Sequence, residues 1–544
     1  MNIFRQILHR LIGPLPLLML TLLASTAESG EIRQFWFYKS ANLLVDANIA
    51  EVTALFERAG KAGYTHCLLT DSKFSRLHEM PDRYFKNVAT VKAAAKKAGI
   101  EIVPALFSIG YSNDLLGQDP NLIEAMPVRE MPLVVEKGTV RAADAPPKLK
   151  NADFSNPKGW SWQDPNVDLS GGTAVFREPQ GKVSRISQTI SVAPYRQYHI
   201  HLRIRSEKFE GTPEVKLIAD GHVLNYDYLK VEPTQDWKTH HVVFNSNEHT
   251  TAQLYVGAWD GGTGWFECDD VTIEEVPFLN LVRREGTPLV LKTAEGKTLK
   301  EGTDFERLAD PLMGTEPYGG CYTVYHEPPR FKTALPDGTR LTASWYHAVT
   351  VHDDQANICP SEPKTLEILR DQAQRVHKLF GAKGYMMSHD EIRVFNQCGA
   401  CRARNLDAGA MLAENVRSCI GLLREVNPGG RIYVWSDMFD PHHNAKKDYY
   451  LVRGDYTGSW EGVDRDVTIV PWYFEKREES LKFFADRGHR QVIAGYYDAN
   501  PEQIRDWIGA AGPYAGVEAV MYTTWRNDFS NLEAFLKEAR SALK

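Results

Sequence analysis

Two acidic residues, Asp390 and Glu391, stand side by side directly after the short apolar run GYMM. Successive side chains of a strand point to opposite faces, so neighbouring acids can share one site only where the strand ends and the chain turns. Such a pair suits general acid–base chemistry, because mutual repulsion raises the pKa of one of the two carboxyls. Arg393 follows closely, and we expect it to be an ion-pair partner of these acids rather than a catalyst.

More polar and aromatic residues come at the ends of other apolar, strand-like segments. Together they suit a pyranose ring, since aromatic faces bind its C–H surface while polar groups hold its hydroxyls. Taken alone, the acidic pair is better explained as two solvated loop acids or a helix cap, and only its place among the other strand ends favours a functional site. Asp71 and Tyr111 either line the same pocket or serve as ordinary loop residues. The candidates for the sugar-binding surface are His389, Trp435, Asp437, Trp472, Tyr496, Asp498, Trp525 and Asn527.

The bulk composition argues against several classes of partner. The 544 residues are too many for one ordinary core, so two or more domains are expected. Hydrophobic residues make up 43% and charged residues 24%, as in ordinary globular proteins. The formal net charge is -7 and no basic tract stands out, so nucleic acid is not an expected partner.

The N-terminal segment has the features of an export signal. Arg5 and Arg10 precede the apolar stretch LIGPLPLLMLTLLAS, and small residues follow it in ASTA. This order predicts a secretory signal peptide over residues 1–27, cleaved near Ala27. No later segment is long and apolar enough for a membrane span. We therefore expect a secreted or periplasmic protein without a membrane span.

The order of apolar segments predicts the fold. RQFWFY, YTHCLLT and IEIVPALFS alternate with two amphipathic helices closed by Gly63 and Gly99. Five more strand-like segments come late in the chain, mostly separated by helical stretches, and eight β-α units close a barrel. Between the two sets lie short strand-like segments with turn residues and no helix, typical of a β-sandwich. The expected fold class is α/β: a (β/α)8 TIM barrel with an inserted β-sandwich (jelly-roll) domain.

Five segments follow from this interpretation. Residues 1–27 are the signal peptide, and residues 28–148 are the first part of the catalytic barrel. Residues 149–277 are the inserted sandwich, and residues 278–340 are a β-rich connecting segment. Residues 341–544 are the second part of the barrel.

Seven cysteines are an odd number for an exported chain, so at least one thiol stays free or pairs elsewhere. Cys398 and Cys401 form a CxxC, which is compatible with a zinc site or a local disulfide. Cys359 and Cys419 could complete a four-thiolate site. We expect a local disulfide or ordinary buried thiols instead, and no metal at the catalytic site.

The segment ICPSEPKTLEILRDQAQRVHKLF, followed by GYMMSHDEIR, resembles the part of family 20 glycoside hydrolases, the β-N-acetylhexosaminidases, that leads into their catalytic Asp-Glu. The resemblance continues through VWSDMF, VPWYF, YYD and TTW, and it covers most of residues 355–530. It implies a retaining exo-hydrolase with substrate-assisted catalysis, in which the 2-acetamido group of the sugar is the nucleophile.

The resemblance also implies roles for individual residues. Glu391 matches the general acid/base, and Asp390 matches the residue that orients and charge-stabilises the acetamido group. Tyr496 would hydrogen-bond the acetamido carbonyl, and Asp498 would bind a ring hydroxyl. The aromatic walls of the sugar pocket match Trp435, Trp472 and Trp525.

The departures from the family concern sugar recognition. The family commonly has a His and two Gly ahead of the Asp-Glu, where this chain has MMSH at 386–389. The Arg of its first strand is replaced by Ala41, with Lys39 as a substitute, and its Trp-x-Glu ends in Asn527. The family's small α/β domain before the barrel is missing. Two alternatives follow: a glycosidase of the same clan acting on another sugar, or a glycan-binding protein on a catalytically idle barrel.

The inserted segment resembles carbohydrate-binding modules found beside xylanases and cellulases, through NADFSNPKGW, SQTISVAPYRQYHIHLRIRS, DWKTHHVVFNS and GWFECDDVTIEEV. Such modules either bind glycan or only shape a neighbouring cleft. The resemblance implies a structural calcium site to which Asp269 and Asp270 could contribute, although one Asp-Asp supplies too few oxygen ligands to demonstrate it. No other cofactor is expected, and the expected partner is an oligosaccharide or glycan substrate.

Overall fold

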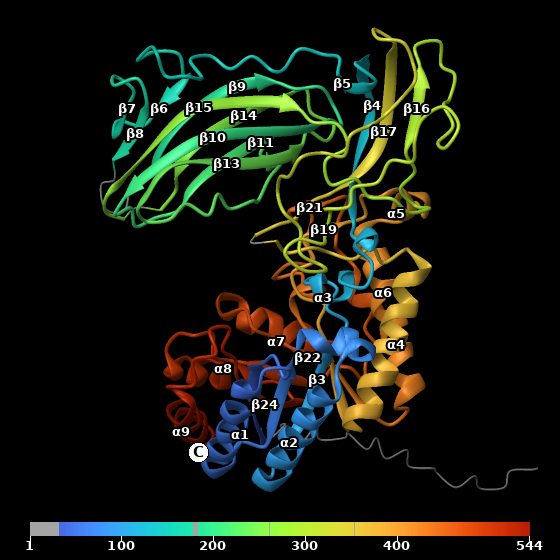
Figure 1. Cartoon of the computed structure of the whole chain (residues 1–544). Helices are drawn as coiled ribbons and strands as arrows, with labels where there is room; N and C mark the ends of the chain where they lie inside the picture. Colours follow the sequence, from blue (N-terminus) through green and yellow to red (C-terminus); the bar gives the residue numbers. More distant parts are fainter. Residues whose placement is uncertain (1–31, 178–182, 261, 353) are drawn as a thin grey trace, which may run out of the picture.

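The computed structural model describes residues 32–177, 183–260, 262–352 and 354–544. A parallel barrel forms one end of the molecule, and antiparallel sheets form the other (Figure 1). In the part of the chain that is described, no helix has the length and apolar character needed to cross a membrane. The predicted signal peptide, residues 1–27, lies outside the described residues.

Eight parallel strands close the barrel in the order β1-β2-β3-β18-β20-β22-β23-β24. Alternate side chains, such as Trp36 and Leu68, point inward and fill the interior, and Phe37 and Leu69 point outward. The strands are β1 (Gln34–Ser40), β2 (His66–Thr70), β3 (Glu101–Leu106), β18 (Gly384–Met387), β20 (Arg431–Trp435), β22 (Thr468–Val470), β23 (Gln491–Ala494) and β24 (Val517–Tyr522).

Helices follow most of the barrel strands, and their buried faces pack with the outward-facing strand residues into the largest core. Gly63 and Gly99 end the first two helices with φ of 103° and 70°, a left-handed conformation that glycine adopts without steric cost. The helices are α1 (Asp46–Ala62), α2 (Asp82–Ala98), α4 (Pro363–Phe380), α6 (Ala408–Val426), α7 (Arg477–Asp486), α8 (Ile504–Ala511) and α9 (Leu532–Ala542).

The expected (β/α)8 TIM barrel with one inserted β-sandwich (jelly-roll) domain is wrong. The barrel is closed and parallel, but the fully described connection from β20 to β22 has no α-helix. It contains only the 3-10 turns η3 (Asp437–Phe439) and η4 (Ser459–Gly462) and the short strand β21 (Leu451–Val452). Its Pro, Gly, Asn and Asp residues favour turns over helix. The antiparallel part is also larger than one sandwich, because it includes a separate four-stranded sheet.

Two five-stranded antiparallel sheets enclose a core of their own. Strict alternation along β11, where every second residue is buried, gives its sheet one inner face. One sheet has the order β13 (Gln235–Asn245), β10 (Gln197–Glu207), β15 (Trp265–Glu275), β8 (Ala174–Arg177) and β7 (Val167–Asp168). The other has the order β12 (His222–Val223), β11 (Pro213–Ala219), β14 (Thr251–Ala258), β9 (Ser184–Ser191) and β6 (Trp162–Gln163).

A four-stranded antiparallel sheet with a third core joins these parts. Its order is β16 (Val290–Thr293), β17 (Arg340–Ala348), β4 (Ala125–Glu136) and β5 (Thr139–Ala142). Strands β4 and β5 fall in the range expected for the barrel, but they belong to this antiparallel sheet. Strand β4 pairs with β17, which lies more than 200 residues later in the chain. The domain boundaries themselves stay a prediction.

Candidate active site

A cavity of about 550 Å³ opens at the C-terminal ends of the barrel strands. Residues at or just beyond the ends of all eight strands contribute to its lining, a common position for ligand sites in barrels. Its aromatic lining consists of Tyr38, Tyr111, Trp435, Trp472, Tyr497 and Trp525, and its acidic lining of Asp71, Asp114, Asp390 and Glu391.

Both residues of the acidic pair line this cavity, for different backbone reasons. Asp390 continues the inward phase of Met386 and Ser388, whereas His389 takes the outward phase. Glu391 has a left-handed φ of 46°, so the chain turns there and its side chain joins the same face as Asp390. The requirement that the strand end at this pair is therefore met.

The Glu391 carboxylate is held by two neighbours. Arg393 Nη2 lies 2.7 Å from Glu391 Oε1, and the Tyr111 hydroxyl donates a hydrogen bond to Oε2. Arg393 also donates to Tyr111 and to Gln355 Oε1. Arg393 is thus an ion-pair partner, and Tyr111 belongs to the cavity. The carboxylate is fixed in one orientation before any substrate binds.

Burial raises the pKa of Asp390 to about 8, with the negative charges of Asp437 and Glu391 adding to the shift. Burial likewise raises the pKa of Asp437 to about 7. Asp437 lies beneath the cavity, where its Oδ2 accepts the Glu391 backbone N–H at 2.8 Å and the Asn444 amide at 3.0 Å. Near neutral pH the site therefore holds protonated carboxyl groups beside the Arg393 ion pair.

The aromatic side chains form a continuous wall. Trp472 and Tyr497 stack with ring centroids 5.6 Å apart, and Tyr497 meets Trp525 edge-on at 6.1 Å. Trp525 in turn lies 5.0 Å from Tyr38 and 5.8 Å from Trp435. Flat apolar faces beside carboxylates provide the surface that a sugar ring requires.

Three predicted site residues point away from the cavity. Tyr496 is only 2% exposed and stacks on Tyr522 at 4.1 Å, in the core behind the barrel wall, so Tyr497 takes the lining position. Lys39 is buried on the outer face of β1 and pairs with Glu51 at 2.5 Å. His389 is fully buried against Asn415 of α6, 3.2 Å away. For Lys39 and His389, strand alternation places the neighbouring residues inside instead. For Tyr496 the phase changes beyond β23, because Val492 and Ala494 face the barrel interior whereas Tyr496 does not.

Asp498 supports the cavity rim, and neither Asp498 nor Asn527 is among the lining residues. The Asp498 carboxylate accepts hydrogen bonds from the backbone N–H of Trp525 at 2.7 Å and from the Thr524 hydroxyl at 2.5 Å. Asn527 Oδ1 accepts a hydrogen bond from Lys39 Nζ at 3.3 Å. Asp498 thereby positions Trp525, whose ring remains 41% exposed at the cavity.

Two amides that sequence reasoning missed hold the loop that carries Glu391. Gln355 Nε2 donates to the carbonyls of Gly110 (2.7 Å) and Glu391 (2.9 Å). Asn357 joins Gly110 to Val394, with distances of 2.6 Å to the Gly110 carbonyl and 2.9 Å from the Val394 N–H. Both precede α4, where the chain returns to the barrel, and no local motif in the sequence marks them.

Asp269 and Asp270, which were expected to contribute to calcium binding, lie beside the guanidinium group of Arg203. Arg203 Nη1 lies 3.1 Å from Asp270 and 4.0 Å from Asp269. Calcium at this position therefore stays a prediction. Among the described residues, the candidate metal ligands that lie close together are elsewhere, at Glu124, Cys359, Cys398 and Cys401.

No protein-family profile matches the sequence, and no curated protein matches it. A rhamnosidase from Novosphingobium sp. PP1Y is similar over 95% of this chain and 59% of its own, with 11% identity and a TM-score of 0.34. A family 4 carbohydrate-binding module covers 24% of this chain and 100% of its own (18% identity, TM-score 0.21). The module TmCBM61, solved with β-1,4-galactotriose, covers 24% of this chain and 97% of its own (19% identity, TM-score 0.20). At these TM-scores the likenesses support no argument about fold or function.

Proposed function

We propose that the protein is a glycoside hydrolase, a retaining exo-acting β-N-acetylhexosaminidase exported from the cell. The observation that carries this proposal is the placement of Asp390 and Glu391 on one face of an aromatic-walled cavity. The identity of the sugar comes from the resemblance to family 20 and depends on a 2-acetamido group in the substrate.

In the proposed first step, the acetamido oxygen of the bound sugar attacks its own anomeric carbon and the glycosidic bond breaks. Glu391 receives the proton that Asp390 holds in the resting site and gives it to the leaving oxygen, and an oxazolinium ion forms. Its positive charge lies beside Asp390 and favours the ionised form of that carboxyl, because an opposite charge nearby lowers a carboxyl pKa. In the second step Glu391 takes a proton from water. The water oxygen attacks the anomeric carbon, and the oxazolinium ring opens.

The positions of the other residues support a modified assignment. Tyr497 replaces Tyr496 as the hydroxyl near the acetamido carbonyl, because it is 48% exposed and lines the cavity. Trp435, Trp472 and Trp525 hold the ring faces. Asp437 acts as a positioning residue, because it accepts the Glu391 backbone N–H and does not itself line the cavity.

The test is hydrolysis of a panel of chromogenic β-glycosides with and without a 2-acetamido group. We expect cleavage of N-acetylglucosaminides or N-acetylgalactosaminides, with a fall in kcat of about 10²- to 10⁴-fold in Glu391→Gln. Glu478→Gln, exposed on α7, is the matched control and should retain activity.

Other results would favour the alternatives. Cleavage confined to sugars without an acetamido group would retain the hydrolase and remove the substrate-assisted mechanism. No turnover together with glycan-array binding that Trp525→Ala abolishes would indicate a glycan-binding protein on an idle barrel.

A further inference from the structure

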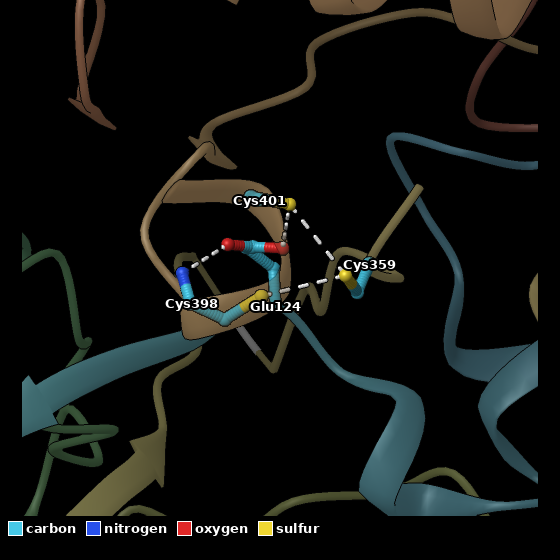
Figure 2. Close-up of side chains that lie close together, drawn as sticks. All are labelled: Glu124, Cys359, Cys398 and Cys401. Atoms are coloured by element: carbon cyan, nitrogen blue, oxygen red, sulfur yellow. Dashed lines mark hydrogen bonds between the residues drawn. The ribbon is translucent and has the colours of Figure 1, made fainter. Parts of the chain in front are cut away.

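Three cysteines and a glutamate meet where the chain leaves the barrel and returns to it. Glu124 precedes β4, Cys359 precedes α4, and Cys398 and Cys401 belong to the turn and start of α5 (Gly399–Ala403). All four side chains are fully buried and converge from three separate segments (Figure 2). Their potential ligand atoms all lie within 4.8 Å of one another.

The spacing of these atoms fits one tetrahedral ion. Cys359 Sγ lies 3.4 Å from Cys398 Sγ and 3.6 Å from Cys401 Sγ, and Cys401 Sγ lies 3.3 Å from Glu124 Oε2. A Zn–S bond of about 2.3 Å gives a tetrahedral S···S edge of about 3.8 Å. The sulfurs are too far apart for a disulfide, which requires about 2.05 Å.

The glutamate is oriented as a ligand by its own hydrogen bonds. Glu124 Oε1 accepts the backbone N–H groups of Gln397 at 2.7 Å and Cys398 at 2.6 Å. Its other oxygen, Oε2, faces the Cys401 sulfur (Figure 2). Fixing one carboxylate oxygen while the second points into the ligand group is the arrangement that supports metal binding.

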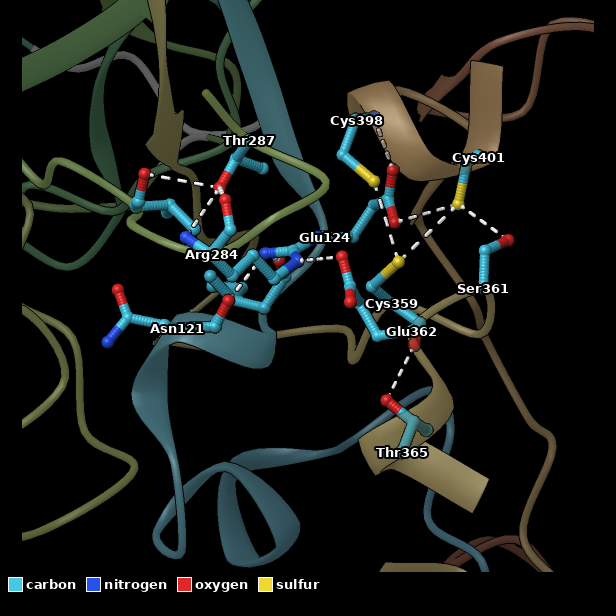
Figure 3. A network of polar contacts seen from close by, with 12 residues as sticks. Asn121, Glu124, Arg284, Thr287, Cys359, Ser361, Glu362, Thr365, Cys398 and Cys401 are labelled. Atoms are coloured by element: carbon cyan, nitrogen blue, oxygen red, sulfur yellow. Dashed lines mark hydrogen bonds and ion pairs between the residues drawn. The ribbon is translucent and has the colours of Figure 1, made fainter. Parts of the chain in front are cut away.

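A positive side chain stands at the edge of the group. Arg284 Nη1 donates to the carbonyl of Ile123, the neighbour of Glu124, at 2.8 Å, and its Nε lies 2.7 Å from Glu362 (Figure 3). Three thiolates and a carboxylate carry more negative charge than a divalent ion neutralises. Arg284 supplies part of the positive charge that is still needed to balance these ligands.

We propose that Glu124, Cys359, Cys398 and Cys401 bind one structural zinc ion. Thiolate ligands select zinc over harder divalent ions such as calcium and magnesium, and four protein ligands in a buried group match a closed structural site. The ion would tie the segments on both sides of the inserted sheets to the loop that follows Glu391. It takes no part in the proposed reaction, so this inference is independent of the proposed function.

The first test is the metal content of the purified full-length chain. We expect about one zinc per chain by mass spectrometry of the metals, and an occupancy at least ~10-fold lower in Cys359→Ser, Cys398→Ser and Cys401→Ser. Cys419→Ser is the matched control, since Cys419 is buried in α6 outside the group and its replacement should leave the zinc in place. Equal zinc in the variants and the wild type would overturn the proposal.

A second test does not depend on folding of the variants. Wild-type protein stripped with a chelator is titrated with Co²⁺, and thiolate-to-cobalt charge-transfer absorption should saturate at one equivalent. Chelation should also lower the Tm, because a bound ion stabilises the folded state. Thiol alkylation of the denatured, metal-free chain should modify every cysteine. Absence of zinc together with an unmodified cysteine pair would show a disulfide instead, and absence of zinc with all thiols reactive would show a metal-free core.

Discussion

Three carboxyl groups crowd the base of the cavity, and their protonation controls what the site can do. The ionised form of Asp390 is strongly disfavoured, because this carboxyl is buried beside both Asp437 and Glu391. Burial disfavours the charged form, and neighbouring negative charges disfavour it further. A proton on Asp390 at neutral pH is therefore part of the resting site.

This proton gives the stability of the protein a specific pH dependence. Folded Asp390 keeps its proton up to about pH 8, whereas the unfolded chain loses it near pH 4. The folded state thus binds more protons between these values, so this contribution is complete below about pH 4 and is lost as the pH rises to about 8. As the pH rises from about 5 to about 8, the free energy of unfolding of Asp390→Asn relative to wild type should therefore increase, on the order of 2 kcal/mol.

Urea denaturation at both pH values measures this difference. Asp528→Asn is the control, because hydrogen bonds from the Ser530 backbone N–H and hydroxyl lower the pKa of Asp528. Asp528 is therefore ionised in both the folded and the unfolded chain between about pH 5 and about pH 8, and its removal should leave the pH dependence of stability in this range unchanged. Parallel pH profiles for wild type and Asp390→Asn would contradict the raised pKa.

Tyr496 and Tyr497 distinguish two assignments of the hydroxyl near the acetamido carbonyl. The family motif indicates Tyr496, and the structure favours Tyr497. The Tyr497→Phe variant loses a hydroxyl that lies at the cavity, so kcat on N-acetylhexosaminides should fall about tenfold, the equivalent of about 1.4 kcal/mol. The Tyr496→Phe variant loses a hydroxyl that is bonded by Asn531 in the core, away from the cavity, so it should cost about 1 kcal/mol of stability and leave kcat unchanged. Steady-state kinetics and thermal unfolding of both variants distinguish the two, and the reverse pattern would restore Tyr496 to the site.

The acidic pair could be placed by sequence, whereas the phase of other strands could not. Asp390 and Glu391 follow an unambiguous apolar run, and a strand end lets both face one cavity. Tyr496 and Lys39 lie in segments where inward and outward positions are both aromatic or long-chained. Tyr38 follows the inward phase of Trp36, whereas the chain leaves the inward phase of Val492 and Ala494 beyond β23, so that Tyr497 faces the cavity.

At the scale of elements, the cavity depends on a close approach between two loops. Gly110, after β3, touches the carbonyl of Asp390, and an added Cβ would collide with that backbone atom. Gly110→Ala should therefore displace the acidic pair and lower kcat about 10- to 100-fold. Gly509→Ala in α8 is the control, since no atom lies near its Cβ position and the helix should gain up to about 1 kcal/mol. Activity of Gly110→Ala equal to wild type would show that the loops are not tightly coupled.

Local signals and long-range ones differ in how far sequence reveals them. The ends of α1 and α2 follow from Gly63 and Gly99, whose left-handed conformation is a property of a single residue. The connection from β20 to β22 lacks a helix because its turn residues, β21 and packing against α6 replace one. The pairing of β4 with β17 depends on contacts across the whole inserted region, which no local pattern encodes.

At the scale of the whole molecule, a buried asparagine joins the sandwich to the four-stranded sheet. Asn245, at the end of β13, donates from Nδ2 to the Pro127 carbonyl and to His347 Nε2, both at 3.0 Å. His347 can accept this bond because its Nδ1 faces the Ala348 carbonyl at 3.0 Å, and burial lowers the pKa of His347 to about 4. The joint is therefore a neutral hydrogen-bonded network between β13, β4 and β17.

Removing this amide should loosen the joint without unfolding either sheet. Asn245→Leu leaves the Pro127 carbonyl and His347 Nε2 without this donor, at a cost of about 1–3 kcal/mol. Because about 1.4 kcal/mol is a tenfold change in an opening equilibrium, hydrogen exchange in residues 125–128 and 345–348 should accelerate at least tenfold. Asn225→Leu is the matched control: it breaks two similar buried bonds, to Val215 and Leu217, entirely inside the sandwich. Faster exchange should then appear in β11 alone, and identical exchange maps for the two variants would show that Asn245 does not couple the sheets.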